Sequence, residues 1–142
     1  MTLAPDLTQK LQDSFAKQSM METFGASLSY LAHGNIEISA PILEICQQQH
    51  GFGHAALTFG IGDSAAGYAA LSVMPLEAEV LTSEMKIHLL APAKGDILLA
   101  KGRVIKPGRR LVIVESQVFA VENGVSTQVA LMTGTMVPVT PK

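Results

Sequence analysis

The sequence has little cysteine and little charge, and its first 20 residues lack an uninterrupted apolar segment. The single cysteine, Cys46, excludes an internal disulfide and any metal site that needs several cysteines. A formal net charge of -2 and a pI near 6.0 leave no overall field that would attract nucleic acid. Lys10, Asp13 and Lys17 interrupt the apolar residues near the start, unlike the core of a signal peptide. We therefore expect a cytoplasmic protein with no nucleic-acid partner.

Charged residues are 15% of the chain, whereas hydrophobic residues are 48%. The 142 residues and 15.0 kDa fit one domain, residues 1–142, which is large enough to bury a core. This composition has more apolar surface than a small monomer usually hides, so self-association as a homodimer or homotetramer is expected. No pattern in the sequence calls for a cofactor or a metal.

The most informative stretch is residues 55–74, in which Asp63 is the one strongly ionisable side chain. A helix that is apolar on all sides is buried in a core or lies in a membrane. A membrane span is disfavoured because no Lys or Arg flanks the stretch and a central Asp costs roughly 2.5–3.5 kcal/mol on insertion scales. The sequence therefore predicts a buried helix over residues 55–74 that is stopped by Pro75.

Hydrophobic periodicity predicts the remaining elements. An amphipathic N-terminal helix is expected within residues 1–20, from Leu7 to about Met21, followed by a hairpin of residues 24–31 and 36–40. A loop over residues 41–53 precedes the central helix, with one helical turn at residues 42–46. Four strands follow, at residues 81–89, 97–105, 111–121 and 125–137, separated by turns rich in Gly, Pro and Asn.

Short connections between the last four strands predict an antiparallel meander. Only residues 55–74 are apolar enough to fill the concave side of such a curled sheet. The predicted fold class is therefore α+β, with a curled antiparallel sheet wrapped around one long central helix, which is the architecture called the hotdog fold.

Several motifs resemble one enzyme family. The spacing His54-x8-Asp63, the segment at residues 48–52 (QQHGF), the turn at residues 91–93 (APA) and the hairpin at residues 108–110 (GRR) carry the resemblance, which spans about residues 20–137. Together they resemble the hotdog acyl-CoA thioesterases of the phenylacetate-pathway (PaaI-like) type. The resemblance implies hydrolysis of an acyl-CoA thioester at a dimer interface, where one chain supplies the carboxylate and the other part of the pocket.

The resemblance also implies roles for individual residues. Asp63 would be the general base that activates water, or the nucleophile that forms a mixed anhydride. The backbone N–H of Ala55, next to His54 in the turn that starts the helix, would polarise the thioester carbonyl. Gln48 falls on the family's Asn, and Thr82 falls on the residue that orients the water. In this sequence Ala55 and Ala56 replace two glycines of the family's turn. An alanine there is costly if the backbone needs positive φ, but a helix-start conformation accepts it.

The chemistry expected of these groups is consistent with their positions. Free N–H groups at a helix N-terminus stabilise a developing oxyanion, and burial makes a carboxylate two turns further along a better base. An alternative for Asp63 is an N-cap of a helix that begins at Ser64. For His54 two roles are equally consistent with the sequence: it lines the site, or it has a purely structural role in the turn. Thr82 lies on the wrong side of the strand's period-two pattern, so it reaches the site only through a kink or from the partner chain.

Two further patterns have competing explanations. Lys106, Arg109 and Arg110 form a cationic hairpin that would suit the phosphates of coenzyme A, or would simply be solvated. The pattern Gly60-x-Gly62-x-x-Ala65 matches a dinucleotide-binding motif, but no βαβ context surrounds it, so close helix-to-sheet packing explains the glycines better. A non-catalytic hotdog protein that binds acyl-CoA, or a dehydratase, remains an alternative to the thioesterase.

Overall fold

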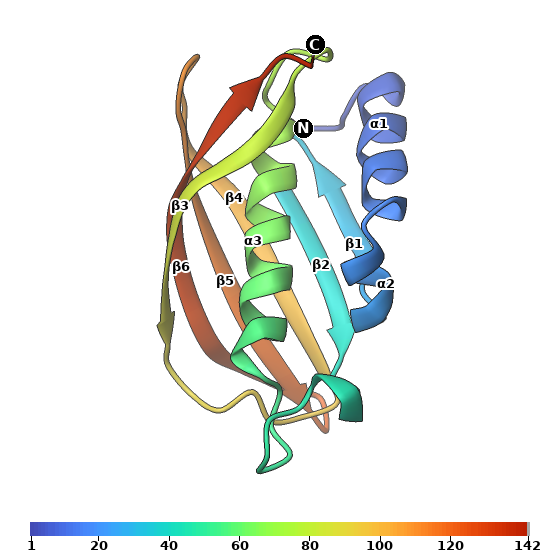
Figure 1. The fold of residues 1–142 in the computed structure, drawn as a ribbon, viewed down its shortest axis with the longest axis vertical. Coiled ribbons are helices and arrows are strands. Elements are labelled where there is room, and N and C mark those ends of the chain that lie inside the picture. The colour runs from blue at the N-terminus through green and yellow to red at the C-terminus, as the bar shows by residue number, and fades with distance from the viewer. Residues whose placement is uncertain (142) are drawn as a thin grey trace.

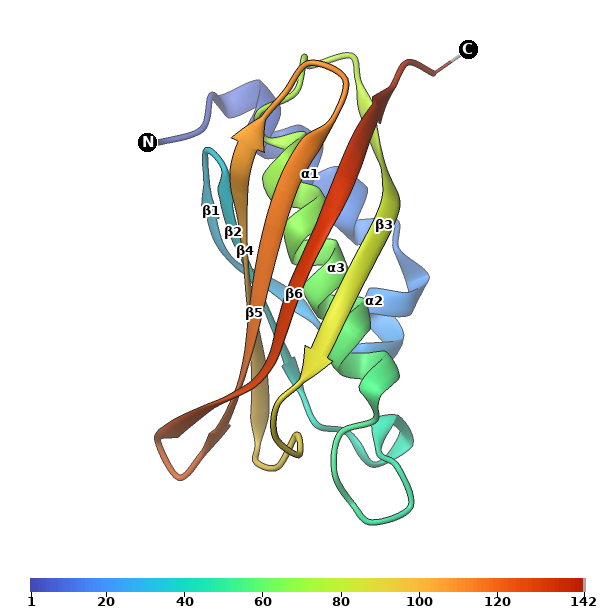
Figure 2. The same cartoon turned by 90° about the vertical axis from the view of Figure 1, so that its left-hand side faces the viewer.

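The structure is a computed structural model that describes residues 1–141, and it has a curled sheet wrapped around one long helix (Figures 1 and 2). The helical elements are α1 (Pro5–Ala16), α2 (Ser19–Phe24), the 3-10 turn η1 (Glu44–Cys46) and the central helix α3 (Ala55–Leu71). The strands are β1 (Ser27–Ala32), β2 (Asn35–Pro41), β3 (Glu79–Leu89), β4 (Ile97–Pro107), β5 (Val112–Glu122) and β6 (Val125–Val139). The α+β hotdog architecture expected from the sequence is confirmed.

The order of strands in the sheet differs from the prediction. The strands are hydrogen-bonded in the order β1-β2-β4-β5-β6-β3, and all neighbours are antiparallel. β4, β5 and β6 form a meander, but β3 pairs with β6 and not with β4, so the four-strand meander is wrong at its first strand. β3 and β4 are about 14 Å apart at three strand spacings, a distance that the extended connection over residues 90–96, about 20 Å long, can cross.

The central helix lies in the concave face of the sheet, where the sequence predicts it (Figure 1). It ends at Leu71, three residues before the predicted end. Ser72 is its C-cap, and the Ser72 Oγ donates a 2.7 Å hydrogen bond to the carbonyl oxygen of Ala69. Most of its residues are buried. Among residues 1–141, no helix combines the length and the apolar character that crossing a bilayer requires.

The N-terminal segment contains two helices where the sequence predicts one. Gln18 has an extended backbone (φ -80°, ψ 97°), which ends α1 and starts α2. Phe24, predicted to open the first strand, instead ends α2, and Gly25 closes that helix with a left-handed conformation (φ 66°). In Figures 1 and 2, α1 and α2 lie beside α3, on the side that the sheet leaves open. The two N-terminal helices and the sheet therefore cover different sides of α3.

Two glycines allow the sheet and α3 to approach closely. A Cβ on Gly102 of β4 would lie 2.3 Å from the backbone carbon of Ala65 in α3. A Cβ on Gly62 of α3 would lie 2.3 Å from the Met132 sulfur in β6. Gly60, Gly62 and Ala65 all lie inside α3, with no strand directly before it, so the dinucleotide-like pattern has its explanation in packing.

We predict that Gly102→Ala lowers the free energy of unfolding by about 1–3 kcal/mol, because overpacking a rigid backbone contact forces a backbone shift. The matched control is Gly67→Ala, whose added Cβ would meet only the Met136 methyl at 4.0 Å. That change should raise stability by about 0.5–1 kcal/mol through helix propensity. Urea denaturation at a fixed protein concentration compares the two. Equal unfolding midpoints would mean that the contact between β4 and α3 does not limit the packing.

Candidate active site

Asp63 lies in the middle of α3, about 12 Å along the helix axis from Ala55. The N-cap of this helix is His54, whose Nδ1 accepts a 2.9 Å hydrogen bond from the N–H of Ala56. The alternative that Asp63 caps a helix beginning at Ser64 is therefore wrong. The His54 ring thus holds the first turn of α3 in place, and a role of His54 in lining the site stays a prediction.

Thr82 reaches Asp63 because β3 contains a β-bulge. Its Oγ1 donates a 2.8 Å hydrogen bond to Oδ1 of Asp63. The register of β3 against β6 shifts between Thr82 and Glu84, so that Thr82 pairs with the fully buried Met136. Beyond the bulge, Met85 returns to the same inner face of the strand. The kink that the period-two pattern requires for Thr82 is thus present.

Burial sets the acid strength of Asp63. Its partly buried position raises the pKa of its carboxyl group above the usual value, because desolvation disfavours the charged form. The hydrogen bond from Thr82 lowers the pKa and offsets part of this effect. A carboxylate whose pKa is raised and whose orientation is fixed by a hydroxyl is suited to accept a proton or to attack a carbonyl.

A pocket of about 260 Å³ adjoins Asp63, between α1, α3, β3 and β6. Polar side chains other than Asp63 and Thr82 line it: Ser14, Gln18, Ser64, Tyr68 and Glu79. The sequence patterns assign no role to Ser14 or Gln18. A signal for them was available, because Lys10, Ser14 and Gln18 recur at a spacing of four, which places polar groups on one side of a helical segment.

The start of α3 presents a backbone donor. Among residues 1–141, the N–H of Ala55 makes no hydrogen bond, whereas that of Ala56 bonds to His54 and that of Leu57 to the His54 carbonyl at 2.9 Å. Ala55 has a helical backbone and no positive φ, so alanine here carries no strain. The replacement of a glycine at this position therefore leaves the donor intact.

Gln48 holds the loop that precedes α3. Its Oε1 accepts hydrogen bonds from the N–H groups of His50 at 2.5 Å and Phe52 at 3.3 Å. Gln48 and Ala55 line the same pocket, of about 540 Å³, together with Thr58 and residues 89–93. The Nε2 group of the Gln48 side chain makes no hydrogen bond within residues 1–141, so it is available to a ligand in this pocket.

The candidate residues thus form two groups within one chain. Gln48 and Ala55 line the pocket at the start of α3, whereas Asp63 and Thr82 line the pocket at its middle. A single chain does not bring the backbone donor and the carboxylate into one cavity. Local hydrogen bonds fix the geometry of each group.

The cationic hairpin lies at the opposite end of α3 from Ala55. Lys106 is near the end of β4, and Arg109 and Arg110 lie in the turn that follows. Arg109 lines a pocket with Pro75, beyond the last turn of α3. Because α3 is about 25 Å long, these cations are not next to the Ala55 donor of their own chain. The structure does not join the three predicted groups within one chain.

The comparisons with known proteins identify the family. The model of the thioesterase superfamily matches residues 50–127, more than half of the chain. A thioesterase family protein from Silicibacter pomeroyi is 40% identical in sequence; the match covers 95% of this chain and 99% of that chain, with a TM-score of 0.93. No curated protein matches the sequence significantly. The chain belongs to the thioesterase superfamily, which supports hydrolysis of an acyl thioester as its general reaction.

More distant solved structures share the fold. The PaaI protein from the phenylacetic acid degradation operon of E. coli is 19% identical over 97% of this chain and 96% of that chain, with a TM-score of 0.83. A mutant thioesterase from Staphylococcus aureus is 20% identical over 87% of this chain and 100% of that chain, with a TM-score of 0.79. The resemblance to hotdog thioesterases drawn from the motifs is confirmed.

We predict that Thr82→Val raises the pKa of Asp63 further, because it removes the hydrogen bond that lowers this pKa. Carbon NMR titration of the Asp63 carboxyl measures the change, and Thr82→Ser is the control that keeps the hydroxyl. The folded pKa of Asp63 lies above its unfolded value of 3.8. The ionised group therefore weakens the fold as pH rises through the folded pKa, and Thr82→Val should cost more stability at pH 7 than at pH 3. A cost that is equal at both pH values would contradict the coupling.

Proposed function

We propose that the protein hydrolyses an acyl-CoA thioester to the free acid and coenzyme A, in a site that two chains of a homodimer build together. The observation that carries this proposal is the division of the candidate residues into two complementary groups. One group offers the Ala55 N–H, which has no partner among residues 1–141, and the other offers Asp63 held by Thr82. The two groups line separate pockets in one chain, so a complete site requires a second chain.

The chemistry of the two groups is complementary. The Ala55 N–H, at the positive end of the α3 dipole, would bind the thioester carbonyl oxygen and stabilise the oxyanion that develops on it. The Gln48 amide would donate to the same region of the substrate. Asp63 of the partner chain would remove a proton from water, or would attack the carbonyl itself. In the first route the hydroxide adds to the carbonyl, the coenzyme A thiolate leaves, and it takes up the proton that Asp63 removed from water. In the second route the thiolate leaves as Asp63 forms a mixed anhydride, and water then hydrolyses the anhydride to the free acid and supplies the proton for the thiolate.

The open edge of β3 supports dimerisation through this strand. β3 pairs with β6 on one side and has no strand on its other side among residues 1–141. It is 11 residues long and carries exposed apolar side chains, with Leu81 and Leu89 each 57% exposed. A long, apolar edge strand pairs readily with another chain. Pairing through β3 would cover the side of the molecule where Thr82 and Asp63 lie.

The cationic hairpin supports coenzyme A as the carrier of the acyl group. None of Lys106, Arg109 and Arg110 forms an ion pair within residues 1–141, although other surface cations do. Cations without a carboxylate partner are available to phosphate groups. These three cations are distant from Ala55 of their own chain. We therefore propose that they bind the phosphates of a coenzyme A whose thioester carbonyl is bound by the Ala55 N–H of another chain.

The first test is thiol release from a panel of short, medium and aromatic acyl-CoAs. Asp63→Asn should lower kcat by about 10²–10⁴, the usual effect of losing a positioned base. Ala55→Pro should lower it by about 10²–10³, because it deletes one oxyanion donor. Proline suits the first position of a helix, and the extended His54 (ψ 146°) accepts a following proline.

Two controls isolate these effects. Ala55→Gly keeps the backbone N–H, and Asp96→Asn removes an exposed carboxylate in the turn before β4. Both should retain wild-type rates. Equal background rates for the wild type and Asp63→Asn would overturn the enzyme proposal, and saturable binding of acyl-CoA without turnover would then favour a non-catalytic binding protein.

A mixing experiment tests the two-chain site. Chains with Ala55→Pro and chains with Asp63→Asn are refolded together at equal amounts. In a site shared across a two-fold axis, each mixed dimer has one site with both lesions and one intact site. Statistical pairing then restores roughly a quarter of the wild-type activity. No recovery in dimers shown to be mixed would mean that one chain supplies both groups.

A further inference from the structure

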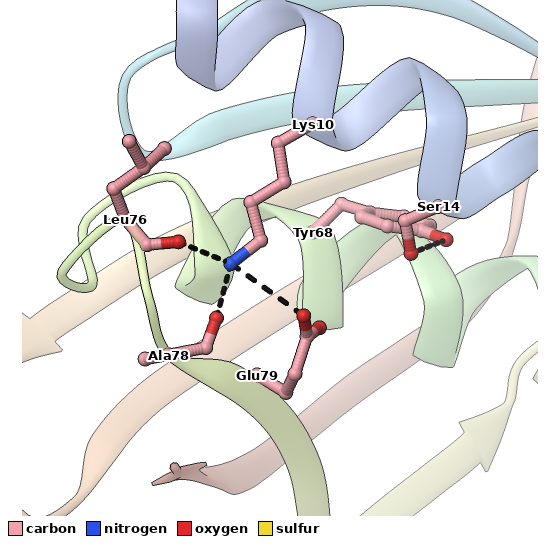
Figure 3. Close-up of polar contacts among 6 residues, drawn as sticks. All are labelled: Lys10, Ser14, Tyr68, Leu76, Ala78 and Glu79. Carbon is pink, nitrogen blue, oxygen red and sulfur yellow. Dashed lines mark hydrogen bonds and ion pairs between the residues drawn. The ribbon is translucent and has the colours of Figure 1, made fainter. Parts of the chain in front are cut away.

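Polar side chains line one side of the pocket beside Asp63, and they come from α1, from the residue between α1 and α2, and from α3. Tyr68 is 4% exposed, and its hydroxyl accepts a 2.7 Å hydrogen bond from the Gln18 side-chain amide. The same hydroxyl is 3.1 Å from the Ser14 Oγ, and a dashed line marks this contact in Figure 3. The Phe15 ring, 6.0 Å from the Tyr68 ring, packs against the other side of this contact. We call Ser14, Gln18 and Tyr68 the polar wall.

The polar wall keeps hydrogen-bonding capacity for a ligand. The Tyr68 hydroxyl accepts from Gln18, and one of the two hydroxyl groups, of Tyr68 or of Ser14, donates to the other. One hydroxyl proton and the side-chain carbonyl oxygen of Gln18 therefore have no partner within residues 1–141. All three residues line the pocket that holds Asp63. A group with both a donor and an acceptor, such as a hydroxyl, satisfies such a surface, whereas a methyl group leaves it unpaired.

The charges around the polar wall favour a neutral group. The nearby cation, Lys10, is occupied: its ammonium donates to the carbonyl oxygens of Leu76 at 2.6 Å and of Ala78, and it lies 3.7 Å from a carboxylate oxygen of Glu79 (Figure 3). Glu79 also lines the pocket, as does Asp63. Among residues 1–141, no Lys or Arg lines this pocket, so a carboxylate at the end of the acyl group would meet the two acidic side chains and would be repelled.

The spacing along α3 sets the length of the acyl group. Asp63 and Tyr68 are five residues apart on the same helix, which is about 7.5 Å along the axis. Apolar side chains of Val80, Leu71 and Met136 complete the lining of the same pocket. An extended chain of about six carbons spans the distance from a carbonyl at Asp63 to the polar wall.

Given the proposed function, we propose that the polar wall selects acyl groups of about six carbons that carry a neutral hydroxyl at the end distant from the thioester. Ser14, Gln18 and Tyr68 are specificity residues that bind the distal hydroxyl, and they take no part in the bond-breaking step. The same chain therefore provides the Asp63 carboxylate and binds the distal end of the acyl group.

The test compares 6-hydroxyhexanoyl-CoA, hexanoyl-CoA and adipyl-CoA as substrates. For the wild type we expect kcat/KM for the hydroxylated substrate to exceed that for hexanoyl-CoA by about 5–10-fold, the effect of one hydrogen bond, and adipyl-CoA to be the poorest. Tyr68→Phe and Gln18→Leu should bring the ratio to about 1. The control is Gln12→Leu, the same change on the exposed side of α1, which should keep the wild-type ratio. Butyryl-CoA, too short to reach the polar wall, should be hydrolysed equally by the wild type and Tyr68→Phe.

A binding measurement separates this inference from the proposed hydrolysis. Calorimetry with the uncleavable thioethers S-(6-hydroxyhexyl)-CoA and S-hexyl-CoA needs no turnover. A preference for the hydroxylated thioether that Gln18→Leu removes supports the polar wall, even in a protein that hydrolyses none of the substrates. Equal affinity for both thioethers, or equal kcat/KM for hydroxylated and plain substrates at an Asp63-dependent rate, overturns the polar wall and leaves the hydrolysis standing.

Discussion

The structure depends on one constraint: α3 is apolar on nearly every side, so nearly every side of it must be covered. The concave sheet covers the largest part, and Gly62 and Gly102 remove the side chains that would hold the two apart. α2 covers another part, where Phe24 packs directly on Gly60. The side between α1 and β3 remains, and it is only partly closed. Asp63 lies on that side, where a carboxylate is half-buried and yet within reach of a ligand.

The position of Asp63 is a compromise between stability and reactivity. Burial raises the pKa of its carboxyl group, so ionisation of Asp63 weakens the fold. Thr82 offsets part of that cost, but no cation does so, since the ion pairs within residues 1–141 lie elsewhere. A structural aspartate would be expected to have such a cation or to be exposed. An uncompensated carboxylate in an apolar helix is instead typical of a residue retained for its chemistry.

The sequence predicts those features that depend on local pattern. The helix around Asp63, the hairpin turns and the curled sheet follow from apolar runs and turn residues. The features it misses depend on tertiary contacts: the pairing of β3 with β6, the break at Gln18 and the contacts of Ser14 with Tyr68. The β-bulge in β3 is predictable only in part. If Thr82 is to reach the site, the strand must have a kink, but an alternating pattern does not show where the kink lies. The division of the candidate residues between two pockets has no signal in the local pattern of one chain, and only the family resemblance implies a site shared by two chains.

The contacts of Lys10 connect these features to the proposed chemistry. Lys10 ties α1 to the backbone at Leu76 and Ala78, directly before β3, and β3 carries Thr82. The polar wall, Thr82 and Asp63 therefore lie in one packed region, formed by α1, α3 and β3. The Ala55 donor belongs to a different region, held by His54 and the loop of Gln48. For a substrate bound across two chains, one chain would bind the distal end of the acyl group and supply Asp63. The other chain would polarise the thioester carbonyl through the Ala55 N–H. In the proposed dimer, correct alignment would depend on how the two chains meet along β3, so the dimer contact itself would be part of the catalytic geometry.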